Sequence, residues 1–437
     1  MFSVFSLNGQ KCECGKEHLL PKSKVICGQN ILESIVEVVR EYNSKKVFVL
    51  SDKNTFFVCA KKVLQILDEN NIKYTSFCFN ENKLEPNEQS VGSAIMHFDY
   101  ECDLVVGVGS GVINDIGKIL SATAKTPYVI IGTAPSMDGF ASATSSMTRD
   151  GLKISLNSKC ADVIIGDLEI MKNAPMHMLK SGLGDMIAKY VSICEWRISN
   201  LITGEYYCKK TAQIVRNAVK KCVDNANGLL NRQIDAVRAV FEGLVVCGAA
   251  MAYVGSSRPA SGVEHYFSHV WDMRAITFDL PIELHGIQCA VGTYIACNLY
   301  EKIKDIKIDN EKAKLFVEKF NYDNHAEFLN KFLGKSAISM IELEKKEGKY
   351  DKNKHALRLN IIKEKWQEIL QIINDEIPNI AELTNLFDNI GLPKNLEEIS
   401  VDKGILYETF ISTKDIRDKY VLSRLAWDLG IIDQILN

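Results

Sequence analysis

Short β-branched and aromatic runs alternate with amphipathic segments between residues 24 and 167 of this 437-residue chain. Apolar residues recur at helical spacing in Ile31–Tyr42 and Ala60–Asn70, which lie between such runs. Alternating helices and continuously apolar strands are typical of a parallel sheet with helices on both faces. We therefore expect a doubly wound, Rossmann-like α/β domain. Its predicted strands are Lys46–Leu50, Tyr74–Phe79, Leu104–Val108, Tyr128–Ile131 and Val163–Ile165.

Two further patterns refine this picture. Thr144–Thr148 and Leu152–Leu156 flank a turn signal, Asp150-Gly151, and so predict a β-hairpin. After about Ile170, long segments of 3.6-residue period take over, including Ala236–Tyr253 and an apolar stripe from Ile361 to Ile373. The second half is therefore predicted to be all-α.

We place the domain boundary at residue 168. Residues 1–168 would form the dinucleotide-binding α/β domain, and residues 169–437 the helical domain that binds metal and substrate. Residues 301–360 are rich in Lys and Glu, and their mixed signs predict a solvated helical insertion rather than a nucleic-acid-binding patch.

Composition narrows the class of protein. The chain has 52 Lys and Arg against 55 Asp and Glu, 24% charged and 46% hydrophobic residues, which is ordinary for a globular protein and favours neither nucleic acid nor a membrane as partner. Its thirteen cysteines, an odd number in apolar contexts, predict reduced thiols in a cytoplasmic protein. Met1–Phe5 lacks the pattern of a secretion signal. The longest apolar stretch, Gly243–Val254, is too short to cross a bilayer and predicts a buried helix.

Two glycine-rich loops follow predicted strands. In the first, Gly109-Ser110-Gly111 leads from a strand into a helix, where backbone N–H groups and the helix N-terminus can bind a pyrophosphate. The spacing departs from G-x-G-x-x-G, because Val112 stands where the third glycine would follow Gly107 and Gly109, so an ordinary tight turn is an equal alternative. The second loop, Gly132–Ser142, strengthens the ligand-binding interpretation, because ligands bind at the carboxyl ends of parallel strands.

Asp52 follows the first of the strands predicted above. A carboxylate there can accept hydrogen bonds from an adenosine ribose, or it can cap a helix, since Asp is common at both positions.

Candidate metal ligands gather in the second half. Asp185 lies in Ser181–Lys189, His265 and His269 are four residues apart and would share a helix face, and His285 follows shortly afterwards. Imidazole and carboxylate suit a divalent transition ion, and three protein ligands with one open position are typical of catalytic sites. Any one histidine alone would more simply be a hydrogen-bonded core residue. Spacing does not decide whether both His265 and His269 are ligands.

A separate cluster, Cys12-x-Cys14-Gly15-x-x-His18, offers two thiols and an imidazole. It could hold zinc with a fourth ligand from elsewhere, although structural zinc sites normally carry a second ligand pair. The alternative is a hairpin with incidental thiols.

Taken together, these motifs resemble the sn-glycerol-1-phosphate dehydrogenases, particularly the bacterial AraM branch, within the superfamily of iron-type alcohol dehydrogenases and dehydroquinate synthases. The resemblance extends from Cys12–His18 to Leu425–Gly430. Its specific stretches are Gly107–Asp115, Gly132–Ala143, Gly182–Lys189, Ser261–Asp272 and His285–Gly292.

This resemblance implies roles for particular residues. Asp185, His265 and His285 would hold one divalent catalytic metal ion, nickel or zinc or iron, while Asp185, His269 and Asp138 would contact substrate. As our own hypothesis, either His269 or a metal-linked water relays the proton in catalysis. The nicotinamide cofactor, NAD or NADP, would lie on the two loops, with Asp52 at its adenosine end and Ser142 nearby. The residues of the two loops are Gly111, Val112, Ile113, Asn114, Asp115, Thr133, Ala134, Pro135 and Ser136.

The implied activity is reversible, metal-dependent reduction of dihydroxyacetone phosphate to sn-glycerol 1-phosphate by a homo-oligomer. The implied substrate is thus a small molecule. Asp52 favours NAD slightly, because a carboxylate repels the 2′-phosphate of NADP. Arg258 and Lys189 are candidates for binding the substrate phosphate, and surface or helix-stabilising charges are the equal alternative for both. Glycerol dehydrogenase, a dehydroquinate synthase-like cyclase and a non-enzymatic scaffold are the alternatives, and the intact Asp185, His265 and His285 argue against the scaffold.

Overall fold

The computed structural model describes residues 9–437. Met1–Phe5, considered above for a secretion signal, lies outside the described residues. Cα proximity divides the chain into two compact units. The first runs up to Met186 and includes Asn217–Gly255, and the second comprises Ile187–Arg216 and Ser256–Asn437. The α/β elements end at Asp167, whereas the first compact unit also takes in later helices, so the boundary at residue 168 stays a prediction.

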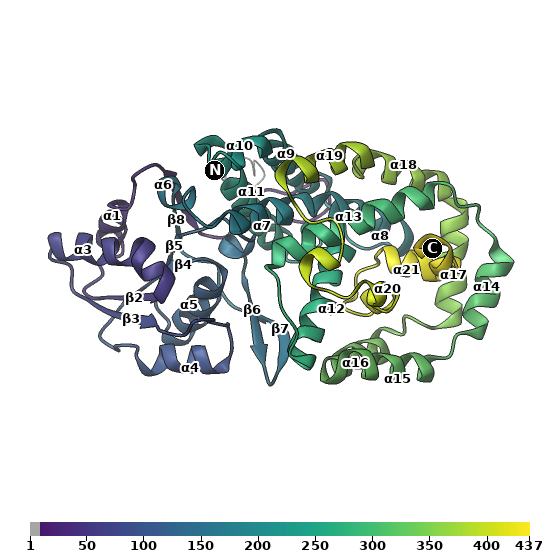
Figure 1. The fold of residues 1–437 in the computed structure, drawn as a ribbon, viewed down its shortest axis with the longest axis horizontal. Helices are drawn as coiled ribbons and strands as arrows, with labels where there is room; N and C mark the ends of the chain where they lie inside the picture. The colour runs from purple at the N-terminus through teal and green to yellow at the C-terminus, as the bar shows by residue number, and fades with distance from the viewer. Residues whose placement is uncertain (1–8) are drawn as a thin grey trace. The chain divides into compact units, whose positions relative to one another are not determined.

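The described part of the first unit contains a six-stranded, fully parallel sheet (Figure 1). Its strand order is β1-β8-β5-β4-β2-β3, and this confirms the predicted α/β fold. All five predicted strands are present, and four of them extend by one or two residues at their carboxyl ends. The strands are β1 (Lys24–Gly28), β2 (Val47–Asp52), β3 (Tyr74–Phe79), β4 (Leu104–Gly109), β5 (Tyr128–Gly132) and β8 (Val163–Asp167).

Helices cover both faces of this sheet (Figure 1). Alternate strand residues, such as Val49 and Val106, join one buried cluster with the apolar sides of α1 (Ser34–Glu41) and α3 (Lys61–Glu69). Residues of the opposite parity face α4 (Glu88–Met96) and α5 (Gly111–Ala124), as the packing of Tyr128 against Gly117 illustrates. Alternation of side chains along each strand therefore produces the two-sided burial that the continuous apolar runs predicted.

The predicted hairpin is present as β6 (Thr144–Arg149) and β7 (Leu152–Asn157), which pair antiparallel. Asp150 and Gly151 both have positive φ, 54° and 73°, as a two-residue turn of this hand requires.

From residue 168 onward, the described residues form helices and connecting loops. The predicted helical stripe is divided into α17 (Lys352–Glu364) and α18 (Trp366–Glu376) at Lys365, whose φ of −108° and ψ of 19° interrupt the helix.

The longer helices are α7 (Met176–Ile187), α8 (Lys189–Thr203), α9 (Lys209–Asp224), α11 (Ile234–Val254), α12 (Val263–Phe278), α13 (His285–Lys304), α14 (Asn310–Lys319), α15 (Tyr322–Leu333), α16 (Ala337–Glu347), α17 (Lys352–Glu364), α18 (Trp366–Glu376), α19 (Ile380–Ile390), α20 (Leu406–Thr413) and α21 (Leu422–Leu429). Short helices are α2 (Lys53–Thr55), α6 (Leu168–Met171), α10 (Ala226–Leu229) and α22 (Ile432–Leu436), with 3-10 turns at Gly139–Ala141, Gly334–Ser336, Glu397–Ile399 and Lys403–Ile405 and a π-helical turn at Phe56–Ala60.

The helix α11 contains the longest apolar stretch of the sequence. By length and composition alone it is a candidate membrane span, yet 78% of its apolar window is buried within the protein. Its Phe241 packs against Gly166 of β8, so the expected buried helix is confirmed as part of the first unit's core.

Candidate catalytic site

The first glycine-rich loop turns from β4 directly into α5, with Ser110 as the N-cap residue. A Cβ at Gly109 would lie 2.6 Å from Cβ of Ile113, so the tight turn requires glycine there. Glycine is needed at Gly107 for a different reason: a side chain there would overlap the ring of Tyr128. The first backbone N–H groups of α5 have no partner within the helix and are therefore suited to a phosphate.

The second loop is hydrogen-bonded to the first. The Thr133 amide donates to the Gly109 carbonyl at 3.0 Å. The Ser110 hydroxyl lies 3.0 Å from the Ala134 carbonyl, to which it donates, and 2.7 Å from Oγ of Ser136. Since β4 and β5 are neighbours in the sheet, the structure brings these two predicted loops together. Ser142 lies further along, where its Oγ is 2.9 Å from Oγ1 of Thr144.

Two side chains of α5 are hydrogen-bonded to the backbone of the second loop. Nδ2 of Asn114 and Nζ of Lys118 donate to the Gly139 carbonyl at 3.0 and 2.6 Å. Burial raises the pKa of Asp115 to about 6, against the opposing charge of Lys118. Sequence reasoning missed Lys118, although its place four residues after Asn114 on one helix face was a usable signal.

Asp52 caps the helix that follows β2. Its Oδ1 accepts from the amides of Asn54 and Thr55 at 2.8 and 2.9 Å, and the Asp52 amide donates to the Thr55 hydroxyl at 3.0 Å. The structure therefore gives Asp52 the helix-capping role that was one of the two interpretations. Its contact with a ribose stays a prediction.

Within the first unit, Asp138 and Asp185 are neighbours. The Asp138 amide donates to Oδ2 of Asp185 at 2.9 Å, and the Asp185 side chain is fully buried. The reason is the close packing of α7 against the second loop: a Cβ at Gly182 would overlap the carbonyl oxygen of Pro135, and Oγ of Ser181 donates to the Ser136 carbonyl at 2.9 Å.

Within the second unit, α12 and α13 bring the three candidate histidines together. The ring of His285 lies 5.1 Å from that of His265 and 6.2 Å from that of His269, measured between centroids. His265 and His269 come from successive turns of α12, as their spacing predicted, and His285 is the first residue of α13.

Hydrogen bonds fix the protonated nitrogen of two of these histidines. Nδ1 of His265 donates to Oε1 of Glu264 at 2.8 Å. Nδ1 of His285 donates at 3.0 Å to Oγ of Ser268, whose own proton goes to Oε1 of Gln288. In both rings the Nε2 atom therefore carries the lone pair, which is the usual state of a metal-ligating histidine.

Cys289 lies one turn after His285 and was not among the predicted site residues. Its Sγ is 3.5 Å from Nε2 of His285, and the ligand atoms of His265, His285 and Cys289 lie within 4.8 Å of one another. Burial acts to raise the pKa of the Cys289 thiol, but the two histidines beside it lower that pKa below its usual value. The i, i+4 spacing from His285 was the signal in the sequence.

A buried carboxylate supports the start of α12. Oε2 of Glu195 accepts from the Val263 amide at 2.9 Å, and Oε1 accepts from the Leu422 amide at 2.8 Å. A side chain at Gly262 would approach Glu195 and Glu264 closely, so glycine is needed at this N-cap. These contacts fix the turn that carries His265.

The two predicted phosphate-binding candidates have other partners or are buried. Arg258 forms ion pairs with Glu205 and, at 3.0 Å, with Asp418. Lys189 is fully buried in α8. Their contact with a substrate phosphate stays a prediction.

The family model of iron-containing alcohol dehydrogenases matches residues 26–175. Among solved structures, a 1,3-propanediol oxidoreductase has a TM-score of 0.64 at 17% identity, with 96% of this chain and 99% of the other covered. A glycerol dehydrogenase from Schizosaccharomyces pombe has a TM-score of 0.61 at 16% identity, with 96% and 91% covered. The fold is thus that of the iron-type alcohol dehydrogenases.

Relatives in sequence identify the family more specifically than the fold does. The glycerol-1-phosphate dehydrogenase [NAD(P)+] of Archaeoglobus fulgidus is 32% identical, with 73% of this chain and 87% of the relative covered. That of Halalkalibacterium halodurans is 30% identical, with 68% and 76% covered. The chain belongs to the glycerol-1-phosphate dehydrogenase family, as the motifs predicted, and it is an oxidoreductase.

Proposed function

We propose that this enzyme reduces dihydroxyacetone phosphate reversibly to sn-glycerol 1-phosphate, with NADH or NADPH as the reductant. Its family membership supports the substrate and the cofactor. The observation that carries the chemistry is the fixed tautomer of His265 and His285, since both rings keep their Nε2 lone pairs for a metal ion.

The donors fit a divalent ion. We assign the metal to Asp185, His265 and His285, which together offer one carboxylate oxygen and two imidazole nitrogens. Nickel, zinc and iron all accept such ligands, and three protein ligands leave a position open to substrate. When bound, the ion supplies Lewis acidity toward the ketone oxygen and the nicotinamide supplies the hydride.

The remaining residues position the substrate and move its proton. His269 lies one turn after His265 on α12, and its side chain would return a proton to the developing alkoxide. Asp138, whose amide is bound to Asp185, would accept a hydrogen bond from a substrate hydroxyl. After His269 has given up its proton, a proton from solvent restores its imidazole for the next turnover.

We place the cofactor phosphates on the N-terminus of α5 at Gly111–Asp115 and on Thr133–Ser136, near Ser142. The hydrogen bond between the Ser110 and Ser136 hydroxyls and the one from the Thr133 amide to the Gly109 carbonyl support one continuous polar surface there. Asp52 would take the ribose hydroxyls, and it favours NAD over NADP through its charge.

The proposal also covers the cellular compartment of the enzyme, its oligomeric state and its partners. All thirteen cysteines lie in the described residues as thiols, which supports a reducing compartment such as the cytoplasm. We propose a homo-oligomer acting on a small molecule, without nucleic acid or membrane as partner. Light scattering of the purified enzyme tests the oligomeric state.

The deciding experiment follows NADH consumption by metal-replete enzyme with dihydroxyacetone phosphate and with dihydroxyacetone in parallel. Strong preference for the phosphate, with the sn-1 product by chiral analysis, supports the proposal. Preference for dihydroxyacetone would assign the enzyme to the polyol dehydrogenases, and turnover of neither would refute both assignments.

A further inference from the structure

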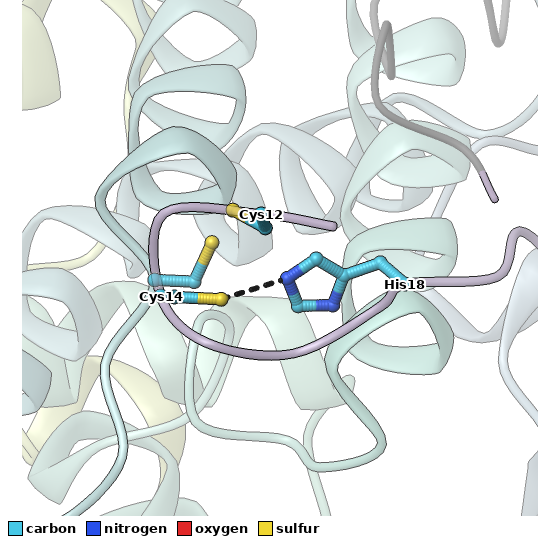
Figure 2. Close-up of side chains that lie close together, drawn as sticks. Cys12, Cys14 and His18 are labelled. Carbon is cyan, nitrogen blue, oxygen red and sulfur yellow. Dashed lines mark hydrogen bonds between the residues drawn. The ribbon is translucent and has the colours of Figure 1, made fainter. Parts of the chain in front are cut away.

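A second group of side chains that could bind a metal ion lies in the first unit, in a loop that takes no part in the proposed reaction. Sγ of Cys12, Sγ of Cys14 and a ring nitrogen of His18 lie within 4.8 Å of one another. Figure 2 shows the three side chains on the inside of one backbone loop, with Cys14 hydrogen-bonded to His18. From this arrangement we propose that Cys12, Cys14 and His18 bind a structural zinc ion.

The backbone of this loop is shaped for convergence of its side chains. The Cys12 amide donates to the Lys16 carbonyl at 2.9 Å, and the Gly15 amide donates to the Cys12 carbonyl at 3.0 Å. Gly15 has φ of +86°, a conformation that favours glycine, and Lys11 and Glu17 form an antiparallel bridge. This tight turn directs Cys12 and Cys14 to the side on which His18 returns.

The orientation of His18 is the second, independent observation. Its Nδ1 lies 2.9 Å from the Tyr253 carbonyl, and a carbonyl can only accept, so Nδ1 carries the proton. Nε2 therefore carries the lone pair, and it faces Sγ of Cys14 at 3.1 Å. A ring nitrogen that donates to a backbone carbonyl while the other faces thiols is the outer-shell arrangement of a zinc-ligating histidine.

Burial and distance agree with a structural ion. Cys12 and His18 are 4% and 2% exposed, and the imidazole stacks on the ring of Tyr253 at 4.4 Å. Ligand atoms of a tetrahedral zinc site are about 3.5–3.8 Å apart, as follows from Zn–S of about 2.3 Å and Zn–N of about 2.0–2.1 Å. The present separations, from 3.1 Å between Cys14 and His18 to at most 4.8 Å, would each need to change by about 1 Å or less to reach that geometry.

Such an ion would fasten a loop without regular secondary structure to the C-terminal end of α11. Two thiolates and one imidazole are softer donors than the carboxylate and imidazoles assigned to the catalytic ion, so zinc is the metal expected here. The fourth ligand is water or another side chain.

Metal-stripped wild-type enzyme titrated with Zn²⁺ alone tests this proposal. Alkylation by iodoacetamide, followed by peptide mapping, should show Cys14 becoming at least tenfold less reactive once zinc is bound. Cys27 and Cys78 are half-buried like Cys14 and serve as internal controls whose labelling should not change. Unchanged labelling of Cys14 at saturating zinc would overturn the proposal, and this experiment requires no variant that must fold.

A second measurement separates this site from the catalytic one. In a Cys289→Ser background, the Co²⁺-loaded enzyme should show a thiolate-to-cobalt charge-transfer band, which disappears when Cys12 and Cys14 are both replaced by Ser. His265→Ala with His285→Ala in the same background should keep the band, whatever becomes of dehydrogenase activity. Persistence of the band without Cys12 and Cys14 would contradict the proposal. Serine substitution of each of the other cysteines in turn would identify a fourth thiolate.

Discussion

Glu264 and His265 are adjacent in the chain, and Oε1 of Glu264 accepts a hydrogen bond from Nδ1 of His265 at 2.8 Å. The same oxygen accepts from the Gly262 amide at 2.7 Å, so the carboxylate joins the start of α12 to the orientation of the imidazole. Glu264 is fully buried, and its contact with His265 makes Nε2 the more basic ring nitrogen.

Replacing Glu264 by Gln should therefore weaken metal binding without removing a ligand. We expect the metal dissociation constant to rise about 10–100-fold, because outer-shell partners of metal-ligating histidines have effects of this size. Competition with a chromogenic chelator measures it. Glu301→Gln, on the exposed side of α13, is the matched control and should leave the constant unchanged. Equal affinity in the two variants would show that Glu264 does not act through His265.

The proposed division of roles among the site residues gives a second prediction. Asp185→Asn, His265→Ala and His285→Ala should each lose metal and activity together. His269→Ala should keep the metal, measured as ions per chain by mass spectrometry, while its turnover falls about 100-fold or more through loss of the proton relay. Full loss of metal in His269→Ala would mean that His269 is itself a ligand.

The sequence predicted the two glycine-rich loops more completely than the contacts around the histidines. β4 and β5 were visible as apolar runs, and the ends of neighbouring parallel strands necessarily bring Gly111 and Thr133 together. The spacing of His265 and His269 likewise indicated a shared helix face. Cys289 was missed although its spacing from His285 on α13 was a local signal. The contact of Ser268 with His285 was not predicted, because it depends on how α12 packs against α13, which a local pattern does not encode.

The break at Lys365 illustrates the same limit. The apolar stripe continues through it, and neither Gly nor Pro marks an end, so the sequence predicted one helical segment where the structure has α17 and α18. Tertiary packing decides such a break, and hydrophobic periodicity does not detect it.

A third prediction concerns the packing of α7 on the second loop. Gly182→Ala should lower the free energy of unfolding by about 1–3 kcal/mol and weaken NADH binding, because the new methyl group would overlap the Pro135 carbonyl. Gly92→Ala in α4 is the control: no atom lies within 4 Å of its added Cβ, and alanine favours the helix by up to about 1 kcal/mol. Urea unfolding and fluorescence titration with NADH measure the two effects. Wild-type behaviour of Gly182→Ala would show that the loop can move aside.

Asp52 allows the charge at the adenosine end to be tested separately from the helix cap. Asn caps helices as well as Asp does, so Asp52→Asn should leave stability nearly unchanged. Removing the carboxylate should raise NADPH affinity relative to NADH about fivefold, the factor for roughly 1 kcal/mol between unit charges 4 Å apart in water. Dissociation constants of both cofactors provide the measurement. An unchanged ratio would place the 2′-phosphate away from Asp52.

His325, buried in the second unit, should make stability depend on pH. Burial and the nearby Lys414 lower its pKa from 6.5 to about 4, while Oδ2 of Asp415 lies 2.8 Å from its Nε2. At about one pH unit above 6.5 and higher the ring is neutral in both states, so it adds no pH dependence there. As the pH falls from 6.5 to 4, the unfolded chain takes up the proton first, and the free energy of unfolding should decrease by up to about 3 kcal/mol. Urea unfolding between pH 7.5 and 4.5 should show a smaller decrease for His325→Gln than for wild type. The exposed His97→Gln should retain the wild-type slope, and equal slopes in all three proteins would assign the acid sensitivity to other groups.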